Sequence, residues 1–254
     1  MLLAVDVGNT QTHVGAFAGA ELIGDWRLAT RGDSTADELA LAIAGSLDFR
    51  DLDRGSVEGL ILSTVVPRLA PEYERLCSHH IEVPFLPVGP AARTGMPILI
   101  DNPHELGSDR LVNAVASYDR VGGRCLSVDF GTSINVDAVS ADGEYLGGVI
   151  APGLEISIDA LSSRAAKLPR FQLARPEQAI GRNTQTALQS GFAYGFAGLV
   201  DGVVARMREE LGEDATVIAT GGMATTIAPL CETIDEVDSH LTLTGLRLIW
   251  ERNR

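Results

Sequence analysis

Short apolar segments separated by turn residues predict strands along the first third of the chain, and polar segments with capping residues predict helices between them. The run from Val57 to Val65 is almost continuously apolar, which is typical of a buried parallel strand. The expected strands are 2–7, 11–18, 21–29, 57–65 and 81–86. The expected helices run from capping residues 33–38 to about Ile43 and from Pro67 to about Cys77. This alternation is typical of an α/β protein.

The alternation resumes after an irregular segment at 89–107, which is rich in Pro and Gly and is expected to cross between two domains. Beyond it we expect a helix at 108–118 and three more strands that begin just before Asp129. The remaining expected helices are 154–166, 184–211, 224–229 and 241–252, with strands at 216–219 and 233–237.

One short element occurs twice in the sequence. Residues 5–10 read Val-Asp-Val-Gly-Asn-Thr and residues 128–133 read Val-Asp-Phe-Gly-Thr-Ser, so that Asp6 and Asp129 lie 129 − 6 = 123 residues apart. Each copy predicts a tight turn between two strands, with an Asp near the end of the first strand. Glycine lets a ligand approach the backbone, and amides and small hydroxyls in such turns can hold phosphate oxygens.

A single copy would be typical of an ordinary β-hairpin with a polar turn. In both copies, however, two further strands and a helical stretch follow, so the repeated unit is a supersecondary structure. We therefore expect two similar domains, at 1–115 and 116–254, whose turns face a nucleotide from opposite sides. A length of 254 residues accommodates two such domains.

Composition narrows the function classes. The net charge is −14 without a basic stripe, which disfavours nucleic-acid binding. The apolar run 192–200 is far shorter than the roughly 20 residues of a membrane span, and Asp6 arrives too early for a signal peptide. Three cysteines without metal-binding spacing are expected to be buried thiols. We therefore expect a cytoplasmic protein that binds neither nucleic acid nor membrane.

Three features outside the repeat have two interpretations each. Asp109 falls in the first turn of a predicted helix, where it could either stabilise the helix dipole or act in catalysis. Gly221-Gly222 follows a strand, where α/β folds place ligands, but a Gly-Gly pair is more often only a turn. Four glycines form a stripe on one predicted helix and suggest close packing, within the chain or across a dimer, rather than a ligand surface: Gly191, Gly195, Gly198 and Gly202.

Phosphoryl transfer needs phosphate positioning, a metal ion and a base for the acceptor hydroxyl. The two Asp-bearing turns, together with Asp109 where the chain crosses between the domains, meet these needs. Neither a P-loop nor a dinucleotide-binding GxGxxG segment is present, which argues against those modes of nucleotide binding. The absence of GxSxG and HExxH argues against common hydrolases.

Taken together, the motifs resemble type III pantothenate kinases, in the same order and over nearly the whole chain. They are Asp6–Thr10 (DVGNT), Asp101–Arg110 (DNPHELGSDR), Asp129–Thr132 (DFGT), Asp142–Gly148 (DGEYLGG), Ala151–Gly153 (APG), Gly181–Thr184 (GRNT), Ala219–Gly222 (ATGG) and Leu243–Asn253 (LTGLRLIWERN). The resemblance implies duplicated actin-like (ribonuclease H-like) domains, each a mixed β-sheet flanked by helices, as in the actin, hexokinase and Hsp70-like superfamily.

The resemblance also implies ATP-dependent phosphorylation of pantothenate to 4'-phosphopantothenate, the first step towards coenzyme A. Asp109 would be the base, Asp129 would hold a monovalent cation (K⁺ or NH₄⁺), and Asp6 would organise Mg²⁺ through water. The implied ATP contacts are Asp6, Val7, Gly8, Asn9, Thr10, Gln11, Thr12, His13, Thr132, Gly221 and Gly222. The implied pantothenate contacts are Gly107, Ser108, Asp109, Arg110 and Thr184. Family members are typically homodimers, and the glycine-striped helix is the candidate contact.

Two positions depart from the family pattern. Ile134-Asn135 follows the second turn where relatives usually carry small or hydroxyl residues, and Gln11 stands where Asn, His or Arg is more common. Loss of a hydroxyl at Ile134 could alter cation or phosphate geometry and weaken activity. Two alternatives stay open: a catalytically weak or inactive regulatory homologue, and a kinase for a sugar or another small hydroxylated metabolite.

Overall fold

The computed structural model describes residues 1–165, 168 and 171–254 and divides into two compact units. The N-terminal unit comprises 1–95, 102–116 and 242–254, and the C-terminal unit comprises 96–101 and 117–241. This division differs from the continuous domains 1–115 and 116–254 at three places. Segment 96–101 belongs to the C-terminal unit, whereas Ala116 and residues 242–254, which include most of the last helix, belong to the N-terminal unit.

The N-terminal unit is built on a five-stranded mixed sheet with the order β3-β2-β1-β4-β5. Strands β1 (Leu2–Val7), β2 (Gln11–Ala18) and β3 (Glu21–Ala29) form an antiparallel meander, whereas β4 (Gly59–Thr64) and β5 (Phe85–Pro87) continue the sheet in parallel from β1. The three predicted strands of the meander are confirmed to the residue, because each apolar run ends at a turn.

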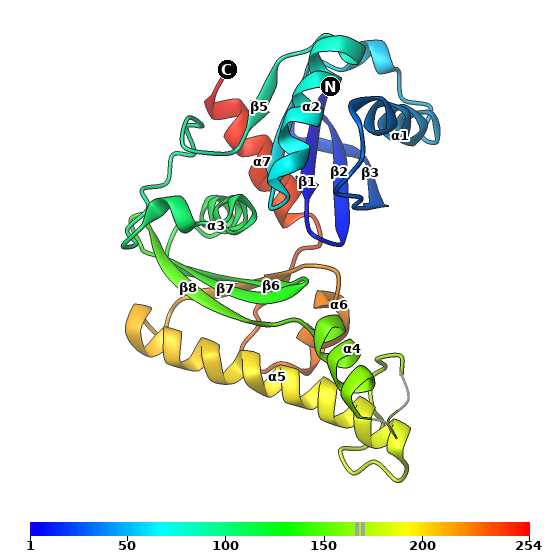
Figure 1. Cartoon of the computed structure of the whole chain (residues 1–254). Helices are drawn as coiled ribbons and strands as arrows, with labels where there is room; N and C mark the ends of the chain where they lie inside the picture. The colour runs from blue at the N-terminus through cyan, green and yellow to red at the C-terminus, as the bar shows by residue number, and fades with distance from the viewer. Residues whose placement is uncertain (166–167, 169–170) are drawn as a thin grey trace. The chain divides into compact units, whose positions relative to one another are not determined.

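Helices flank this sheet. Helix α1 (Ala36–Asp48) begins at a capping box in which the Thr35 hydroxyl accepts from the Glu38 amide, and α2 (Ala70–Leu76) follows a 3-10 turn over Pro67–Leu69. Both contribute apolar side chains to one core with β1, β2 and β4, and Figure 1 shows the two helices beside this sheet. Helix α7 (Leu241–Arg252) packs within the same unit, with Trp250 against Gly59 and Leu243 against Gly15.

The C-terminal unit repeats this topology around a second five-stranded sheet. The order β8-β7-β6-β9-β10 matches β3-β2-β1-β4-β5 strand for strand, with the same antiparallel and parallel pairings. The strands are β6 (Cys125–Phe130), β7 (Ser133–Val139), β8 (Tyr145–Pro152), β9 (Thr216–Thr220) and β10 (Glu236–Val237). The predicted duplication is therefore confirmed in the topology of the two sheets.

The core of the C-terminal unit lies between the sheet and the long helix α5. Helix α5 (Thr184–Leu211) buries Ala197, Val200 and Val204 against β6, β7 and β9, and Figure 1 shows it running along one face of this sheet. The other helices are α3 (Ser108–Val121), which begins in the N-terminal unit and ends in this one, α4 (Leu154–Arg164) and the short α6 (Ala224–Ile227).

Several predicted boundaries are wrong. Helix α1 continues to Asp48, and the strand expected at 81–86 is reduced to 85–87 because a π-turn occupies Cys77–Ile81 and Glu82 adopts a left-handed φ of 49°. The strand expected at 233–237 is only the two residues Glu236–Val237. The backbone amide of Thr233 donates to the Asp201 carboxylate of α5 and so does not pair with a neighbouring strand. The helix expected at 224–229 ends at Ile227 and becomes a 3-10 turn. Helix α4 ends at Arg164, and the expected end at residue 166 lies outside the described residues.

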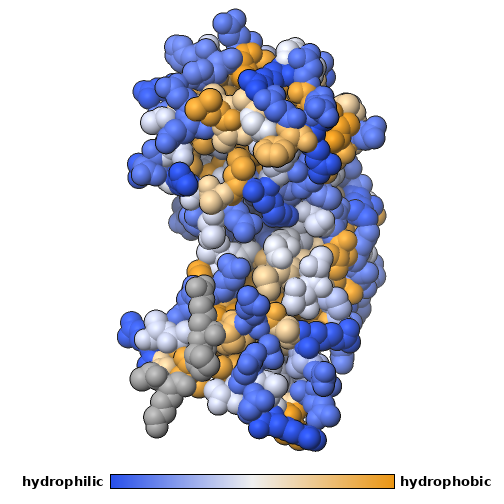
Figure 2. Space-filling model, turned by 90° about the vertical axis from the view of Figure 1, so that its right-hand side faces the viewer, coloured by the Kyte–Doolittle hydropathy of each residue, from blue (hydrophilic) through white to orange (hydrophobic). Residues whose placement is uncertain are grey.

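Figure 2 shows one face of the protein, on which hydrophilic residues predominate and hydrophobic residues are scattered among them. Among the residues that the structure describes, none of the helices combines the length and the apolar composition that a membrane crossing requires.

Candidate active site

The first Asp-bearing turn connects β1 and β2. The Gly8 amide donates to the Gln11 carbonyl at 3.0 Å and closes the turn, leaving Asn9, Thr10 and Gln11 exposed. Asp6 lies behind the turn, directly opposite His13 across the antiparallel ladder, so the two side chains share one face of the sheet. The predicted phosphate loop is thus an exposed backbone turn with a carboxyl group at its base.

Asp109 lies in the same unit, at the start of α3. The Leu111 amide donates to the Gly107 carbonyl at 3.2 Å, which begins the helix. A side chain at Gly107 would crowd Asp109, because a Cβ there would lie 2.5 Å from Asp109 Oδ1. The Ser108 hydroxyl accepts from the Thr64 amide at 3.1 Å and lies 3.0 Å from the Ser63 hydroxyl. Helix α3 therefore begins against the end of β4, the neighbour of β1.

The carboxyl groups of Asp6 and Asp109 both have raised pKa values, and Asp109 contributes to the rise at Asp6. Burial, and after it the Asp109 carboxylate, raise the pKa of Asp6 to about 7, although a hydrogen bond from Ser63 and the charge of Arg27 act in the opposite direction. Burial also raises the pKa of Asp109 above its ordinary value, opposed chiefly by Arg110. Two neighbouring carboxyls that repel each other are a suitable place for a divalent cation, which would relieve the repulsion.

The second Asp-bearing turn, between β6 and β7, has the same construction. The Gly131 amide donates to the Ser133 carbonyl at 3.0 Å, and Asp129 faces Asn135 across the ladder as Asp6 faces His13. The turn is one residue shorter, since 135 − 129 = 6 whereas 13 − 6 = 7. Thr132 is exposed at its tip, where it could reach a ligand.

Close backbone contacts assemble the second turn. Gly221 has a φ of +96°, and a Cβ there would overlap Asp129 Oδ1 and the backbone of Phe130. A Cβ at Gly153 would likewise overlap the Thr132 carbonyl. The structure therefore brings Gly221 and the Ala151–Gly153 motif to the Asp129 turn, whereas Gly222 is exposed beside open space.

Thr184 is the first residue of α5 and is exposed. Its neighbour Asn183 caps the helix by accepting from the Thr186 amide at 2.9 Å. Thr184 belongs to the C-terminal unit and Gly107–Arg110 to the N-terminal unit, so their common role in binding pantothenate stays a prediction.

The departure at Ile134 is explained by packing. Its side chain is fully buried in the core of the C-terminal unit, so it does not take the place of a group that faces a ligand. Asn135 is also buried, and its Oδ1 accepts from the Ser133 hydroxyl at 3.1 Å. Gln11 is exposed in the first turn, consistent with variation at this position.

Three polar residues beside the predicted site residues were not predicted from the sequence: Ser63, Thr220 and Asp25. Ser63 on β4 is paired with Asp6, and Thr220 on β9 is paired with Asp129, each across a parallel ladder. The His13 ring bonds the Asp25 carboxylate of β3, with 2.9 Å between Nε2 and Oδ2. A polar residue at the carboxyl end of an otherwise apolar strand was the available signal for Ser63 and Thr220.

A self-contained metal site is not part of the described chain: no three His, Cys, Asp or Glu side chains there converge as ligands. Magnesium in phosphoryl-transfer sites commonly uses one or two carboxylates together with water and substrate phosphates. Asp6 fits that mode of binding, in which water and the substrate phosphates complete the coordination.

Comparison with known proteins identifies the family. The family model for type III pantothenate kinase matches residues 2–206. A type III pantothenate kinase of Moorella thermoacetica is 48% identical over 253 residues, and one of an Anaeromyxobacter species is 50% identical over 254 residues, each covering 100% of both chains.

Solved structures show the fold. An inorganic polyphosphate/ATP-glucomannokinase of Arthrobacter superposes with a TM-score of 0.52 at 14% identity, covering 100% of this chain and 99% of its own. A Campylobacter jejuni protein assigned to the Baf family of transcriptional activators superposes with a TM-score of 0.61 at 20% identity, covering 99% and 98%. With two sheets of actin-like topology, an Asp-bearing turn in each and full-length identity near one half, the chain belongs to the type III pantothenate kinase family.

Proposed function

We infer that this protein transfers the γ-phosphoryl group of ATP to the primary hydroxyl of pantothenate and forms 4'-phosphopantothenate, the first step of coenzyme A biosynthesis. Full-length relatives named as type III pantothenate kinases support this function. The observation that carries it within the structure is the Asp6–Asp109 pair, in which a carboxyl behind an exposed turn lies close to a second carboxyl at a helix start.

Asp109 is the proposed base. A carboxylate with a raised pKa accepts a proton more readily than an ordinary one, and the alcohol proton must leave as the phosphorus–oxygen bond forms. Gly107 leaves room for this carboxylate, while Ser108 and Arg110 are proposed to contact pantothenate. The exposed turn Gly8–Gln11 is proposed to hold ATP phosphates through its amides and hydroxyls.

Magnesium, when bound, would neutralise charge on the phosphates and polarise the transferred group. Asp6 would hold it through water, because its carboxyl lies at the base of the turn that receives the phosphates. This arrangement needs no preformed cluster of protein ligands.

Asp129 is the proposed site of a monovalent cation. Its Oδ1 lies beside Gly131 of the second turn and beside Gly221, which follows β9. A carboxylate next to backbone carbonyls is a suitable set of ligands for potassium or ammonium. We predict that replacing K⁺ with Na⁺ in the assay lowers kcat, and that Asp129→Asn removes this difference. Equal rates of the wild type in both salts would contradict the assignment.

An assay of ADP release tests the function directly. Turnover with pantothenate and none with sugars is expected, and a phosphorus spectrum should show a phosphate monoester on the primary alcohol. Turnover with a sugar alone would favour the glucomannokinase-like alternative. Nucleotide binding without turnover on either substrate would favour a regulatory homologue, although the retained Asp6, Asp109 and Asp129 argue against this alternative.

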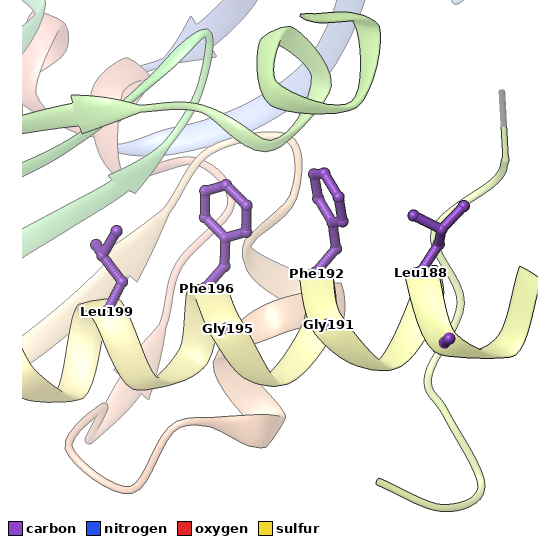
Figure 3. Close-up of a pocket in the computed structure, with 7 residues that line it drawn as sticks. Leu188, Gly191, Phe192, Gly195, Phe196 and Leu199 are labelled. Atoms are coloured by element: carbon purple, nitrogen blue, oxygen red, sulfur yellow. The ribbon is translucent and has the colours of Figure 1, made fainter. Parts of the chain in front are cut away.

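A homodimer through α5 is also proposed. Its glycine stripe does not pack against another part of the described chain, since positions for a Cβ at Gly191, Gly195 and Gly198 open onto free space. Packing of these three glycines against the described part of the chain therefore finds no support, which favours the contact with a second copy. Beside them, the side chains of Leu188, Phe192, Phe196 and Leu199 line a pocket and project from one side of α5, as Figure 3 shows.

A second copy of the chain fits this surface. Glycine costs about 1 kcal/mol per helix position relative to Ala, so an exposed stripe is unfavourable in the isolated chain. A helix of a second copy could approach the bare backbone closely and bury the neighbouring aromatic rings.

The cysteines support the proposed cytoplasmic setting. Cys77 and Cys125 are buried as expected, whereas Cys231 is only partly buried, and all three are free thiols. Burial raises the pKa of each to about 12, so the reactive thiolate is scarce at neutral pH. Three free thiols are typical of a protein in a reducing compartment.

A further inference from the structure

A buried serine joins the two carboxyl-bearing elements of the N-terminal unit. Ser63 is the fifth residue of β4, is fully buried, and is paired with Asp6 across the parallel β1–β4 ladder. Its hydroxyl bonds the Asp6 carboxyl on one side and lies 3.0 Å from the Ser108 hydroxyl on the other. Ser108 immediately precedes Asp109. One side chain therefore contacts both the Asp6 carboxyl and the start of the helix that carries the proposed base.

The direction of these hydrogen bonds follows from their end groups. The Thr64 amide can only donate, so the Ser108 oxygen accepts from it at 3.1 Å. The hydrogen bond with Ser63 lowers the pKa of Asp6 and therefore favours the ionised carboxylate, which can only accept, so Ser63 donates to Asp6. The oxygen of Ser63 is then available to the Ser108 proton, whose alternative acceptor, the Thr64 carbonyl, is farther away at 3.3 Å. The chain therefore runs from Thr64 through Ser108 and Ser63 to Asp6.

We propose that Ser63 is a positioning residue for phosphoryl transfer, because its hydroxyl holds the Asp6 carboxylate and the first turn of α3 in one hydrogen-bonded arrangement. This inference rests on the proposed roles of Asp6 and Asp109. Such a tether matters because transfer requires the acceptor oxygen and the phosphoryl group to meet at a defined distance and angle. A small displacement of Asp109 or Asp6 lowers the rate without removing either group.

The C-terminal unit supplies an independent parallel. Thr220 is paired with Asp129 across the β6–β9 ladder, as Ser63 is paired with Asp6, and it is 2% exposed. Both Asp-bearing strands thus have a buried hydroxyl residue beside the Asp on the adjacent parallel strand. Because Thr220 occupies the equivalent ladder position in the other sheet, threonine is the choice for the rescue variant at residue 63.

The test compares Ser63→Ala with Ser63→Thr. Ser63→Ala should lower kcat by about 10- to 100-fold, which corresponds to about 1.4 to 2.7 kcal/mol in the activation free energy. The KM for pantothenate, and its Kd measured by calorimetry without nucleotide, should stay within about threefold of the wild type. Ser63→Thr keeps the hydroxyl and should recover most of kcat. Ser46→Ala is the matched control, since Ser46 is a buried serine of α1 whose hydroxyl donates to the Ala42 carbonyl at 2.8 Å, and it should leave kcat unchanged.

A double-mutant cycle with Ser108→Ala completes the test. The single variant Ser108→Ala gives a readout of its own if Ser63→Ala folds poorly, because Ser108 is only partly buried, and it should also lower kcat at saturating pantothenate. If the two hydroxyls act as one chain, kcat of the double variant at saturating pantothenate should match the slower single variant. Three results would overturn the inference: a kcat of the double variant that falls by the product of the two single losses, an unchanged kcat in Ser63→Ala, or a loss of pantothenate affinity in Ser63→Ala that parallels its loss of kcat. The cycle does not involve Asp109, so it is distinguishable from failure of the proposed base, which Asp109→Asn tests.

Discussion

At the scale of single residues, environment gives similar aspartates different roles. Asp6 and Asp109 lie in the same unit with raised pKa values, while Asp129 closes a glycine-lined turn in the other unit. Asp109 has a helix-start position that would suit an ordinary dipole-stabilising carboxylate. Its burial, the contact with Gly107 and the nearby Asp6 favour the catalytic interpretation instead.

Asp109→Asn should abolish most turnover and leave nucleotide binding nearly intact. The amide keeps the size of the side chain but cannot accept the alcohol proton, and loss of a general base typically costs about 10²- to 10⁴-fold in rate. ADP release measures the rate, and calorimetry measures ATP binding. Asp119→Asn, an exposed change on the same helix, serves as the control. A near-normal rate in Asp109→Asn would mean that another group takes the proton.

Asp6 should make the metal-free protein less stable as pH rises. The folded state binds a proton at Asp6 up to about pH 7, whereas the unfolded chain releases it near 3.8, so the folded state is favoured below 3.8 and loses this advantage between these values. Asp6→Asn removes the dependence. In EDTA, the wild type should therefore lose stability between pH 5 and pH 8 while the Asp6→Asn variant does not. The difference in the free energy of unfolding, variant minus wild type, should rise over this range by at most about 1.4 kcal/mol per unit of pKa shift. Parallel urea-unfolding curves for both proteins across this range would contradict the prediction.

At the scale of elements, α5 combines two surfaces. Ala197, Val200 and Val204 pack into the core of the C-terminal unit, while Gly191, Gly195 and Gly198 face open space. The core face explains why the helix is stable despite its glycines. The open face has no such explanation within the described chain, which is why a second copy is proposed.

Gly195→Arg should convert the protein to a monomer while the chain stays folded. A Cβ at residue 195 meets nothing within 4 Å in the single chain, so the new side chain disturbs only a partner at that face. Removing a helical glycine should also slightly stabilise the monomer, by up to about 1 kcal/mol. Light scattering after gel filtration reports the mass. Gly45→Arg on α1, where a Cβ also meets open space, is the matched control. Equal masses for both variants and the wild type would exclude α5 as the contact.

At the scale of the whole molecule, the N-terminal unit contains the end of the chain. Residues 242–254 belong to it, and the Asn253 side chain accepts from the Arg93 amide at 2.9 Å. Trp250 is 8% exposed and packs against Gly59 of β4. The N-terminal unit is therefore complete only when the last helix has docked.

Trp250→Ala should destabilise the N-terminal unit specifically. Removing a buried tryptophan from a packed contact typically costs about 3 to 5 kcal/mol. Hydrogen exchange should accelerate in β1 and β4, which lie in the sheet that α7 contacts, and change little in β6 and β7. Uniform acceleration in both sheets would show instead that the two units unfold as one.

What the sequence by itself determined is local. The meander strands 2–7, 11–18 and 21–29, the two Asp-bearing turns and the last helix 241–252 agree with the structure, because alternation and turn chemistry act between residues a few positions apart. The family resemblance rests on the same short motifs, and the comparisons confirm it.

Only the tertiary structure decided which distant residues meet. Ser63 reaches Asp6, and Thr220 is placed beside Asp129, through parallel pairing of strands separated by a long connection. The last helix packs in the same unit as the first sheet. Strand β10 is shorter than expected because the Asp201 carboxylate of α5 accepts from the Thr233 amide. These contacts join segments far apart in the chain. A local hydrophobic pattern predicts that a segment is a strand or a helix, but it does not predict which distant segment packs beside it.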